Sequence, residues 1–457
     1  MTTPTTTGPR ARNPFAIRDF RLLWVGEAVS AIGDQFALIA LPWLALVLTG
    51  SALALGSVLA LMAVPRALLM LIGGVSVDRL SPRRVMLAAN VVRLVAVAIL
   101  GAVVLSGGAQ LWMLYAFGLV FGVADAFFFP AQTSIVPELV EAAELQRANG
   151  IVQGTAQATV LIGPAIAGLV IAAVGSQPAT DGGAAAVAAG AGGAAGIGAA
   201  LLLDAGTFVV SLVTLLVIRP RAHVARPPSS MLDDIKAGFR YTFQKPSLRA
   251  MVLLSLAANL LIVGPFEIGV PVLAYTRLPE GAAAFGILMS AFGGGSLVGL
   301  AFGAMLAAPR PSRFATIVIG ALAFAGVGLA ALAFVSSTAV AAVVIGIAGI
   351  ALGYGNLHGM TWVQARVQPD LMGRVMSVMM LGSMGLVPVS MLIAGAAVQV
   401  SLDGVFVVGG AGMALLSMLS LLSRTVRGMG LEPAYEAAPG DVADDAKART
   451  DIAPASA

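Results

Sequence analysis

Residues 52–106 read ALALGSVLALMAVPRALLMLIGGVSVDRLSPRRVMLAANVVRLVAVAILGAVVLS. Two apolar runs, 52–74 and 85–106, are separated by a short polar stretch that holds Asp78 and three arginines. A helix needs about 20 predominantly apolar residues to cross the hydrocarbon core of a bilayer. The stretch therefore predicts a helical hairpin that crosses a membrane twice, with a basic turn at one surface.

The rest of the chain repeats this pattern. Of its 457 residues, 59% are hydrophobic and only 11% are charged, and the mean hydropathy is +0.96, whereas soluble domains carry about 25% charged residues. We predict an all-α polytopic membrane protein whose twelve transmembrane helices form two six-helix bundles. The spans are expected near residues 20–48, 52–74, 85–106, 111–130, 149–174, 198–218, 250–275, 283–307, 314–335, 338–360, 374–398 and 402–423. The core of the sixth span is expected at Leu201–Ile218, and the Ala/Gly-rich stretch Ala184–Ala200 before it is compatible with either loop or helix.

The basic residues predict the orientation. Twenty-three of the 26 Lys and Arg fall in segments on the side of the N-terminus, Arg277 falls in an outer loop, and Arg66 and Arg93 fall inside spans. Cytoplasmic loops carry an excess of Lys and Arg, so both termini are predicted to be cytoplasmic. The Arg-, Ala- and Gly-rich composition favours a bacterial source and hence the inner membrane. The pI of 9.7 then reflects topology, and no nucleic-acid partner is expected.

The two halves echo one another. Pro137-Glu138-Leu139 and Ile166-Ala167-Gly168 recur in the second half, at similar offsets, as Pro369-Asp370-Leu371 and Ile393-Ala394-Gly395. In duplicated membrane folds of this kind, the substrate site lies near the midplane between the repeats. We predict a cytoplasmic N-terminus at 1–19, an N-terminal bundle at 20–218, a central cytoplasmic loop with an amphipathic helix at 219–249, a C-terminal bundle at 250–424 and a disordered cytoplasmic tail at 425–457.

The loop between spans two and three carries a recognisable motif. It reads Gly74-Val75-Ser76-Val77-Asp78-Arg79-Leu80-Ser81-Pro82-Arg83-Arg84. This resembles the signature loop of the major facilitator superfamily, which has a glycine, three residues, Asp-Arg and then paired basic residues. Gly74 is expected to let two helix ends approach closely, and Asp78 to cap the next helix or pair with a basic group. Arg79, Arg83 and Arg84 are expected to hold the loop at the cytoplasmic surface.

A second motif lies in span five. Gly154, Gly163, Pro164 and Gly168 are similar to the Gly-Pro motif of exporters in this superfamily. Over residues 15–424 the chain resembles the subgroup that contains enterobactin-type siderophore exporters and macrolide or multidrug efflux proteins. The resemblance implies export, with Gly163-Pro164 shaping span five where the halves rock against each other. Further matching segments are Phe129-Pro130-Ala131, Leu203–Phe208, Leu232–Met251 and Gly373–Ser377.

One position departs from the family pattern. Proton-coupled drug exporters carry an arginine in span four, four residues before a glycine, and here Gly118 precedes Gly122. Coupling through that arginine is therefore not carried over, and Arg93 in span three is the candidate substitute.

Charged side chains inside the spans are the candidate site residues, because each costs on the order of 2.5–3.5 kcal/mol at the centre of a bilayer. Glu27 and Asp34 lie seven residues apart on one face of span one, with Asp34 near mid-bilayer. Removal of water at that depth disfavours the charged carboxylate. We predict that Asp34 binds a proton or a cationic substrate group in alternation, and a structural carboxylate is the alternative.

For the other charged residues inside the spans, position in the sequence says less about their role. Glu267 follows Gly264-Pro265 in span seven, which predicts unwound backbone lining a cavity, although a position facing the outer vestibule is equally compatible. Arg66 follows Pro65 and is a candidate for facing the cavity.

Arg93 and Asp125 lie in the cytoplasmic halves of antiparallel spans and are predicted to form a buried pair with a structural or gating role. Asp204 is expected near the outer end of span six as a helix-end or loop partner.

We predict a secondary transporter that is not an enzyme and exports an amphipathic small molecule in exchange for protons. Nutrient uptake or facilitated diffusion by the same fold is the alternative, and a membrane-embedded transferase is a remote one. The chain has no Cys, two His and no ATP-binding loop, so neither a metal site nor a cofactor is expected. The expected partners are a small-molecule substrate, protons and the lipid bilayer, and the expected state is a monomer.

Overall fold

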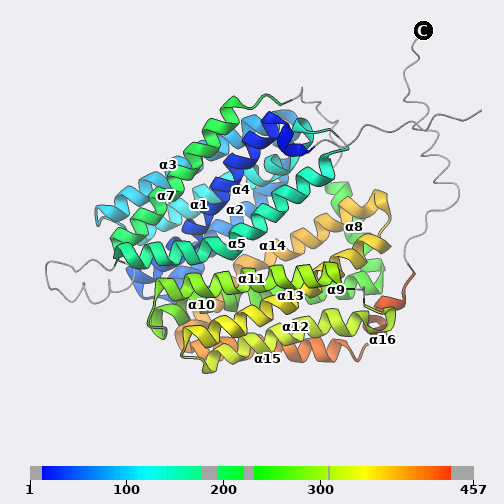
Figure 1. The fold of residues 1–457 in the computed structure, drawn as a ribbon. Coiled ribbons are helices and arrows are strands. Elements are labelled where there is room, and N and C mark those ends of the chain that lie inside the picture. The colour runs from blue at the N-terminus through cyan, green and yellow to red at the C-terminus, as the bar shows by residue number, and fades with distance from the viewer. Residues whose placement is uncertain (1–12, 142, 176–192, 221–230, 307–308, 434–457) are drawn as a thin grey trace, which may run out of the picture.

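The computed structural model describes residues 13–433 except 142, 176–192, 221–230 and 307–308, and these described residues are helices joined by short turns, with no strand among them. The N-terminal half contains α1 (Arg18–Thr49), α2 (Ala52–Arg79), α3 (Pro82–Leu105), α4 (Leu111–Leu139), α5 (Leu145–Gly175) and α7 (Ala194–Val217). The C-terminal half contains α9 (Pro246–Ala258), α10 (Gly264–Thr276), α11 (Ala282–Met305), α12 (Phe314–Ala331), α13 (Thr338–Arg366), α14 (Pro369–Val400) and α15 (Leu402–Ser420). Figure 1 shows these helices as two bundles side by side.

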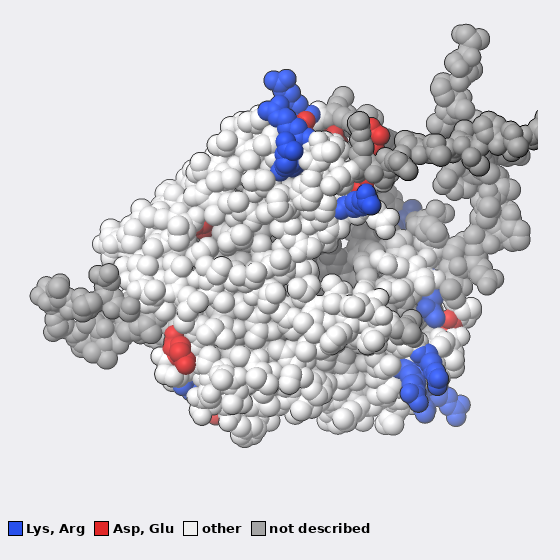
Figure 2. Space-filling view, in the orientation of Figure 1, with Lys and Arg blue, Asp and Glu red and all other residues white. Residues whose placement is uncertain are grey.

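Within the described residues, eleven helices are long and apolar enough to cross a membrane, and the Gly385–Val400 part of α14 is a shorter apolar helix. The predicted all-α polytopic fold of twelve spans in two bundles is confirmed. The protein is therefore a multi-pass membrane protein. Its surface shows little charge between the ends of the bundles, and Lys and Arg gather along the upper and right margins of the view in Figure 2.

Span seven differs from its prediction. Helical hydrogen bonding continues through the Gly264-Pro265 region, where α9 and α10 are joined by a π-helical turn at Asn259–Val263. The predicted unwound backbone is therefore wrong. Pro265 has no N–H to donate to the preceding turn. The wider π turn accommodates the missing hydrogen bond, and the helix continues without a break.

Two boundaries also differ. Helix α7 begins at Ala194, so the last part of the Ala184–Ala200 stretch is helical, and 184–192 lie outside the described residues. The start of the predicted disordered tail is wrong: α16 (Arg424–Gly428) and a 3-10 turn at Met429–Leu431 follow α15. Trp362 Nε1 donates to the Met429 carbonyl at 2.8 Å, which fixes this turn against α13. Residues 434–457 lie outside the described part.

Two helix crossings join the halves. Helix α5 packs on α11, and α2 packs on α14. A Cβ built on Gly286 would collide with the Pro164 carbonyl, and one built on Gly56 would stand 2.5 Å from the Met391 carbonyl. Small residues let helix backbones approach this closely in lipid. The two crossings are equivalent under the repeat, because Gly56 and Gly286 are separated by nearly the same length of chain as Pro164 and Met391.

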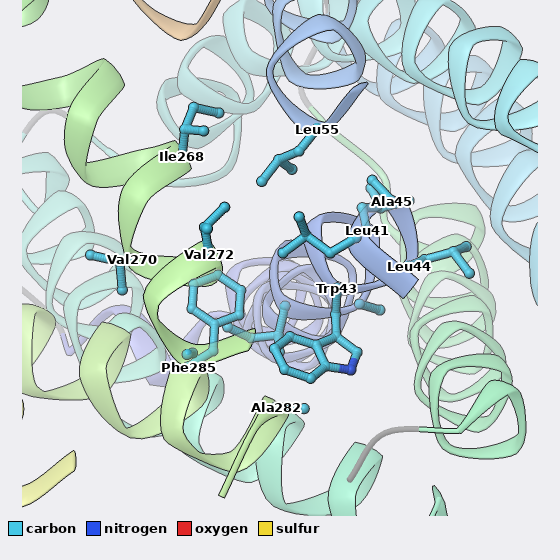
Figure 3. Close-up of a cluster of buried hydrophobic side chains, with 14 of the residues drawn as sticks. Leu41, Trp43, Leu44, Ala45, Leu55, Ile268, Val270, Val272, Ala282 and Phe285 are labelled. Atoms are coloured by element: carbon cyan, nitrogen blue, oxygen red, sulfur yellow. The ribbon is translucent and has the colours of Figure 1, made fainter. Parts of the chain in front are cut away.

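Among the described side chains, a buried core shared by both halves lies at one end of the molecule. We define the basic end as the end that carries the α2–α3 turn, helix α8 (Met231–Gln244) and α16, and the far end as the opposite one. At the far end a continuous core joins the halves through side chains such as Leu41 and Trp43 of α1, Val272 of α10 and Phe285 of α11 (Figure 3). The indole of Trp43 meets the ring of Tyr275 at 5.5 Å between centroids.

At the basic end each half has its own core. One core contains Phe20, Met86 and Ile135 of the N-terminal half, and the other contains Leu248, Trp362 and Val363 of the C-terminal half. Figure 2 shows a hollow between the halves on this side. The structure is therefore closed at the far end and open toward the basic end.

Arg277, the one basic residue that the sequence predicts to lie in an outer loop, forms an ion pair at the far end. Arg277 Nη2 donates to Asp403 Oδ2 at 2.8 Å, and Nη1 donates to the Ala333 carbonyl at 3.1 Å. The hydrogen bond to the Asp403 carboxylate raises the pKa of Arg277. The pair joins the end of α10 to the start of α15.

Candidate functional site

The centre of the N-terminal bundle holds a buried ion pair. Arg93 of α3 donates from Nε to Asp125 Oδ1 of α4 at 2.9 Å, and both residues are at most 3% exposed. The guanidinium carbon also lies over the rings of Phe121, Phe128 and Phe208, at 5.0, 4.3 and 5.3 Å from the ring centroids. A buried cation is tolerated only when such partners compensate its lost hydration. The two residues that the sequence predicts as a pair are thus brought together.

Two further carboxylates lie beside this pair, one of them unexpected. Asp204 is fully buried in the middle of α7, so its predicted place near the outer helix end is wrong. A Cβ on Gly33 of α1 would stand 2.6 Å from Asp204 Oδ1, which places Asp204 against the helix turn that carries Asp34. The signal in the sequence was the spacing of Asp204 from Leu201 and Phe208, which share its buried helix face.

The cluster of Asp34, Arg93, Asp125 and Asp204 has more acids than bases. Arg93 interacts electrostatically with all three carboxylates. Among the described residues, Asp34 Oδ1, Asp204 Oδ2 and Arg93 Nη1 are buried without a hydrogen-bond partner. Three carboxylates and one guanidinium, all ionised, would leave a net negative charge in the bundle interior. The arrangement therefore favours uptake of a proton by one of the acids.

Glu27 belongs to a second polar group nearer the basic end. It is 8% exposed and accepts hydrogen bonds from Gln132 Nε2 at 2.5 Å and from Ser211 Oγ at 3.3 Å. Asn90 Nδ2 in turn donates to Ser211 Oγ at 3.0 Å. Glu27 is thus held by helices α4 and α7, whereas Asp34 Oδ1 has no such partner within the described part.

Arg66 lies at the edge of the cluster. It is half-buried in α2, its guanidinium carbon is 4.3 Å from the centroid of the Phe129 ring, and its charge acts on Asp34. Its Nε is buried without a hydrogen-bond partner among the described residues. Arg66 is therefore placed to respond to the protonation state of Asp34.

Glu267 is separate from the cluster. It lines a cavity of about 210 Å³ inside the C-terminal half, together with apolar side chains such as Phe266, Met289 and Leu329. The prediction that Glu267 lines a cavity agrees with its position, whereas the unwound backbone does not.

A larger cavity of about 600 Å³ lies between α9, α11, α12 and α13. Helix α5 of the other half contributes Gln157 and Val160 to its wall. The lining residues include no charged side chain, and Ser255, Ser296 and Asn356 supply further polar groups. Sequence reasoning missed this cavity, because most of the residues that border it are small or apolar and its few polar groups are uncharged.

The signature loop is only partly as expected. Arg83 donates to the carbonyls of Leu215 and Leu216 at 2.7 Å each and so caps the end of α7, and Arg84 is exposed. A Cβ on Gly74 would meet nothing within 4 Å, so the predicted close approach at Gly74 is wrong. The close approach lies at Gly73, where a Cβ would collide with the Ala126 carbonyl of α4.

The turn between α2 and α3 places Ser81 at the N-cap position of α3. Helix α2 runs on to Arg79, so Asp78 lies in its last turn and Ser81, with φ +77°, is the N-cap residue of α3. The side chain of Asp78 lies outside the described part, so both of its expected roles stay predictions.

The Gly-Pro motif lies where α5 meets other helices. A Cβ on Gly163 would contact the Gln35 side chain of α1, and one on Gly168 would stand 2.5 Å from the Ala282 carbonyl of α11. The backbone N–H of Ala165, next to Pro164, donates to Ser290 Oγ of α11 at 2.9 Å. Gly154, in contrast, meets nothing within 4 Å. The part of the motif around Pro164 is thus the contact between the halves.

Comparison with known proteins places these features in a family. The model of the family described as Major Facilitator Superfamily matches residues 23–389. The multidrug efflux pump Tap of Mycobacterium tuberculosis is 26% identical over 385 residues, which cover 82% of this chain and 85% of Tap. The macrolide efflux protein A of Streptococcus pyogenes is 28% identical over 150 residues, which cover 33% of this chain and 37% of that protein.

Solved structures share the fold at low sequence identity. The nucleoside transporter NupG is 14% identical with a TM-score of 0.65, covering 88% of this chain and 98% of its own. A bacterial homologue of the iron transporter ferroportin, solved in an inward-facing state, is 17% identical with a TM-score of 0.67, also covering 88% and 98% of the two chains. These likenesses concern the fold alone.

Proposed function

Because the chain belongs to the Major Facilitator Superfamily, we propose that it is a secondary active transporter that exports an amphipathic small molecule in exchange for protons. The names of the multidrug and macrolide efflux relatives support the direction and the class of substrate. One chain contains both the charged cluster and the large cavity, so we propose that the monomer is the transporting unit.

The observation that supports proton exchange is a pair of buried carboxylates, neither of which, among the described residues, is paired with an arginine of its own. Asp34 and Asp204 lie on facing helices beside the Arg93–Asp125 ion pair, and each has a buried oxygen without a hydrogen-bond partner in the described part. A proton shared between these acids relieves the excess negative charge. Glu27, in the hydrogen-bonded group, is the position through which a proton passes toward the basic end, and the fixed positive charge of Arg66 on the rim of the cluster acts on Asp34. Glu267, in its separate cavity, is a second position for a proton or a polar substrate group.

The direction of opening fits export. By the excess of Lys and Arg, the basic end faces the cytoplasm of a bacterial cell and the far end faces outward. The hollow between the halves then takes up substrate from the cytoplasm or inner leaflet. Rocking about the α5–α11 and α2–α14 crossings closes the basic end and opens the core at Trp43 and Tyr275.

The test is dye export from cells and uptake into inverted membrane vesicles, with and without a protonophore. Export through the wild type should stop when the protonophore collapses the gradient. Asp34→Asn should lower gradient-driven export at least tenfold, whereas Asp19→Asn, in the first turn of the same helix, should leave it unchanged. Export that ignores the protonophore would refute proton exchange, and net accumulation of the dye in cells would favour uptake.

A further inference from the structure

The larger cavity, of about 600 Å³, has a counterpart in the other half. The contact of Gly122 with the Met62 carbonyl recurs as the contact of Gly349 with the Phe292 carbonyl, which aligns Gly349 of α13 with Gly122 of α4. The contact of Gly198 with the Gly101 carbonyl recurs as that of Gly410 with the Gly326 carbonyl, which aligns Gly326 of α12 with Gly101 of α3. These pairs define which residues occupy equivalent places in the two bundles.

By this equivalence, the cavity lies where the N-terminal bundle holds its ion pair. Arg93 corresponds to Val318, Asp125 to Leu352 and Phe128 to Gly355, and all three C-terminal residues line the cavity. The spatial relation is kept as well: Phe128 covers the Arg93 guanidinium at 4.3 Å, and a Cβ on Gly355 would stand 3.0 Å from the Ala321 Cβ and 3.6 Å from the Val318 carbonyl. The same place in the fold is therefore filled by an arginine and a phenyl ring in one half and left open in the other.

The residues that line this cavity determine which kind of ligand it can bind. A volume of about 600 Å³ lies within the range of small-molecule sites, roughly 300–1,000 Å³. A charged ligand would find no opposite charge among the lining residues to compensate any hydration that it loses there, which is costly. Asn356 and Gln157 offer amide donors and acceptors, and they come from opposite halves.

We infer that this cavity binds an electrically neutral, amphipathic molecule, for which the absence of an arginine at Val318 and of a phenyl ring at Gly355 leaves the room and Asn356 and Gln157 supply hydrogen bonds. The inference rests on the proposed function and assigns its cargo to the C-terminal half, apart from the proton-binding acids. Because Gln157 belongs to the N-terminal half, rocking of the two halves changes the contact between Gln157 and the bound molecule, while the contacts within the C-terminal half are kept.

The test is equilibrium binding to the purified full chain in detergent, with Nile red as a neutral probe and ethidium as a cationic one. The wild type should bind Nile red saturably and ethidium at least tenfold more weakly. Gly355→Phe restores the ring that Phe128 supplies in the other half and should weaken Nile red binding at least tenfold. The control is Gly320→Phe on α12, where an added Cβ meets nothing within 4 Å; it should bind like the wild type.

A near-isosteric change tests the charge argument. Asn356→Asp should weaken Nile red binding and strengthen ethidium binding, whereas Asn356→Leu should weaken the binding of Nile red only. Circular dichroism and gel filtration verify that each variant is folded. Unchanged Nile red binding in folded Gly355→Phe, no saturable Nile red binding by the wild type, or equal affinity for both probes would overturn the inference.

The outcomes separate this inference from the proposed function. Gradient-driven export that is insensitive to Gly355→Phe would overturn the cargo site alone. Nile red binding as expected, in a chain that shows no gradient-driven export, would overturn the proposed function alone.

Discussion

Gly168 of α5 and Gly286 of α11 lie so close across the two halves that a Cβ built on either would stand 3.0 Å from the Cα of the other. Gly395 and Gly56 make the equivalent contact between α14 and α2, with 3.2–3.3 Å between the built Cβ of Gly395 and the Cα atoms of Leu53 and Gly56. The halves thus touch backbone to backbone at two places related by the repeat.

Gly168→Leu should force α5 away from α11. Overpacking of a tight contact costs about 1–3 kcal/mol, and here the cost falls on the relative position of the halves. Dye export should fall strongly, and the thermal unfolding midpoint in detergent should drop. Gly154→Leu, on the same helix where a Cβ meets nothing within 4 Å, should change neither. Equal export by the two variants would contradict a role for this crossing.

Asp204→Asn should uncouple export from the proton gradient. The amide keeps the shape and can still accept the hydrogen bond that Thr207 Oγ1 donates to Asp204 Oδ1 at 3.4 Å, but it cannot share a proton with Asp34. Gradient-driven export into inverted vesicles should fall at least tenfold, while Nile red binding to the purified chain stays within twofold of the wild type. If gradient-driven export stays normal, Asp204 is a structural carboxylate.

Arg93→Met should destabilise the protein more than the double variant Arg93→Met, Asp125→Leu. The single change leaves a buried carboxylate without its ion-pair partner, which costs on the order of 3–5 kcal/mol, whereas apolar replacement of both partners is often neutral. Thermal unfolding of the single variants and the double variant gives the coupling free energy. Additive losses would show that Arg93 and Asp125 are not energetically coupled.

Cross-linking at the far end should lock the structure open toward the basic end. Gln399 Nε2 donates to Ser51 Oγ at 2.9 Å, which joins the start of α2 to the end of α14 across the halves. Because the chain has no natural cysteine, Ser51→Cys with Gln399→Cys introduces the only two thiols. Oxidation should abolish export and reduction should restore it. Ser51→Cys alone should export normally under both conditions, and unimpaired export by the cross-linked form would contradict alternating access about this end.

The amino-acid sequence by itself determined the spans, the duplication and the pairing of Arg93 with Asp125. Each depends on local composition or on equal depth in antiparallel helices, because the bilayer imposes the length and polarity of every span. The echo of Ile166-Ala167-Gly168 in Ile393-Ala394-Gly395 already marked both places where the halves meet.

The tertiary structure decided which way the side chains face and what space they leave. Asp204 joined the cluster because α7 turns it toward Gly33, and the close approach fell at Gly73 because that face of α2 meets α4. The cavity around Gly355 arises where helices of both halves bring mostly small and apolar residues together. Helix rotation and volume depend on packing between distant segments, and no local pattern in a uniformly apolar span specifies them.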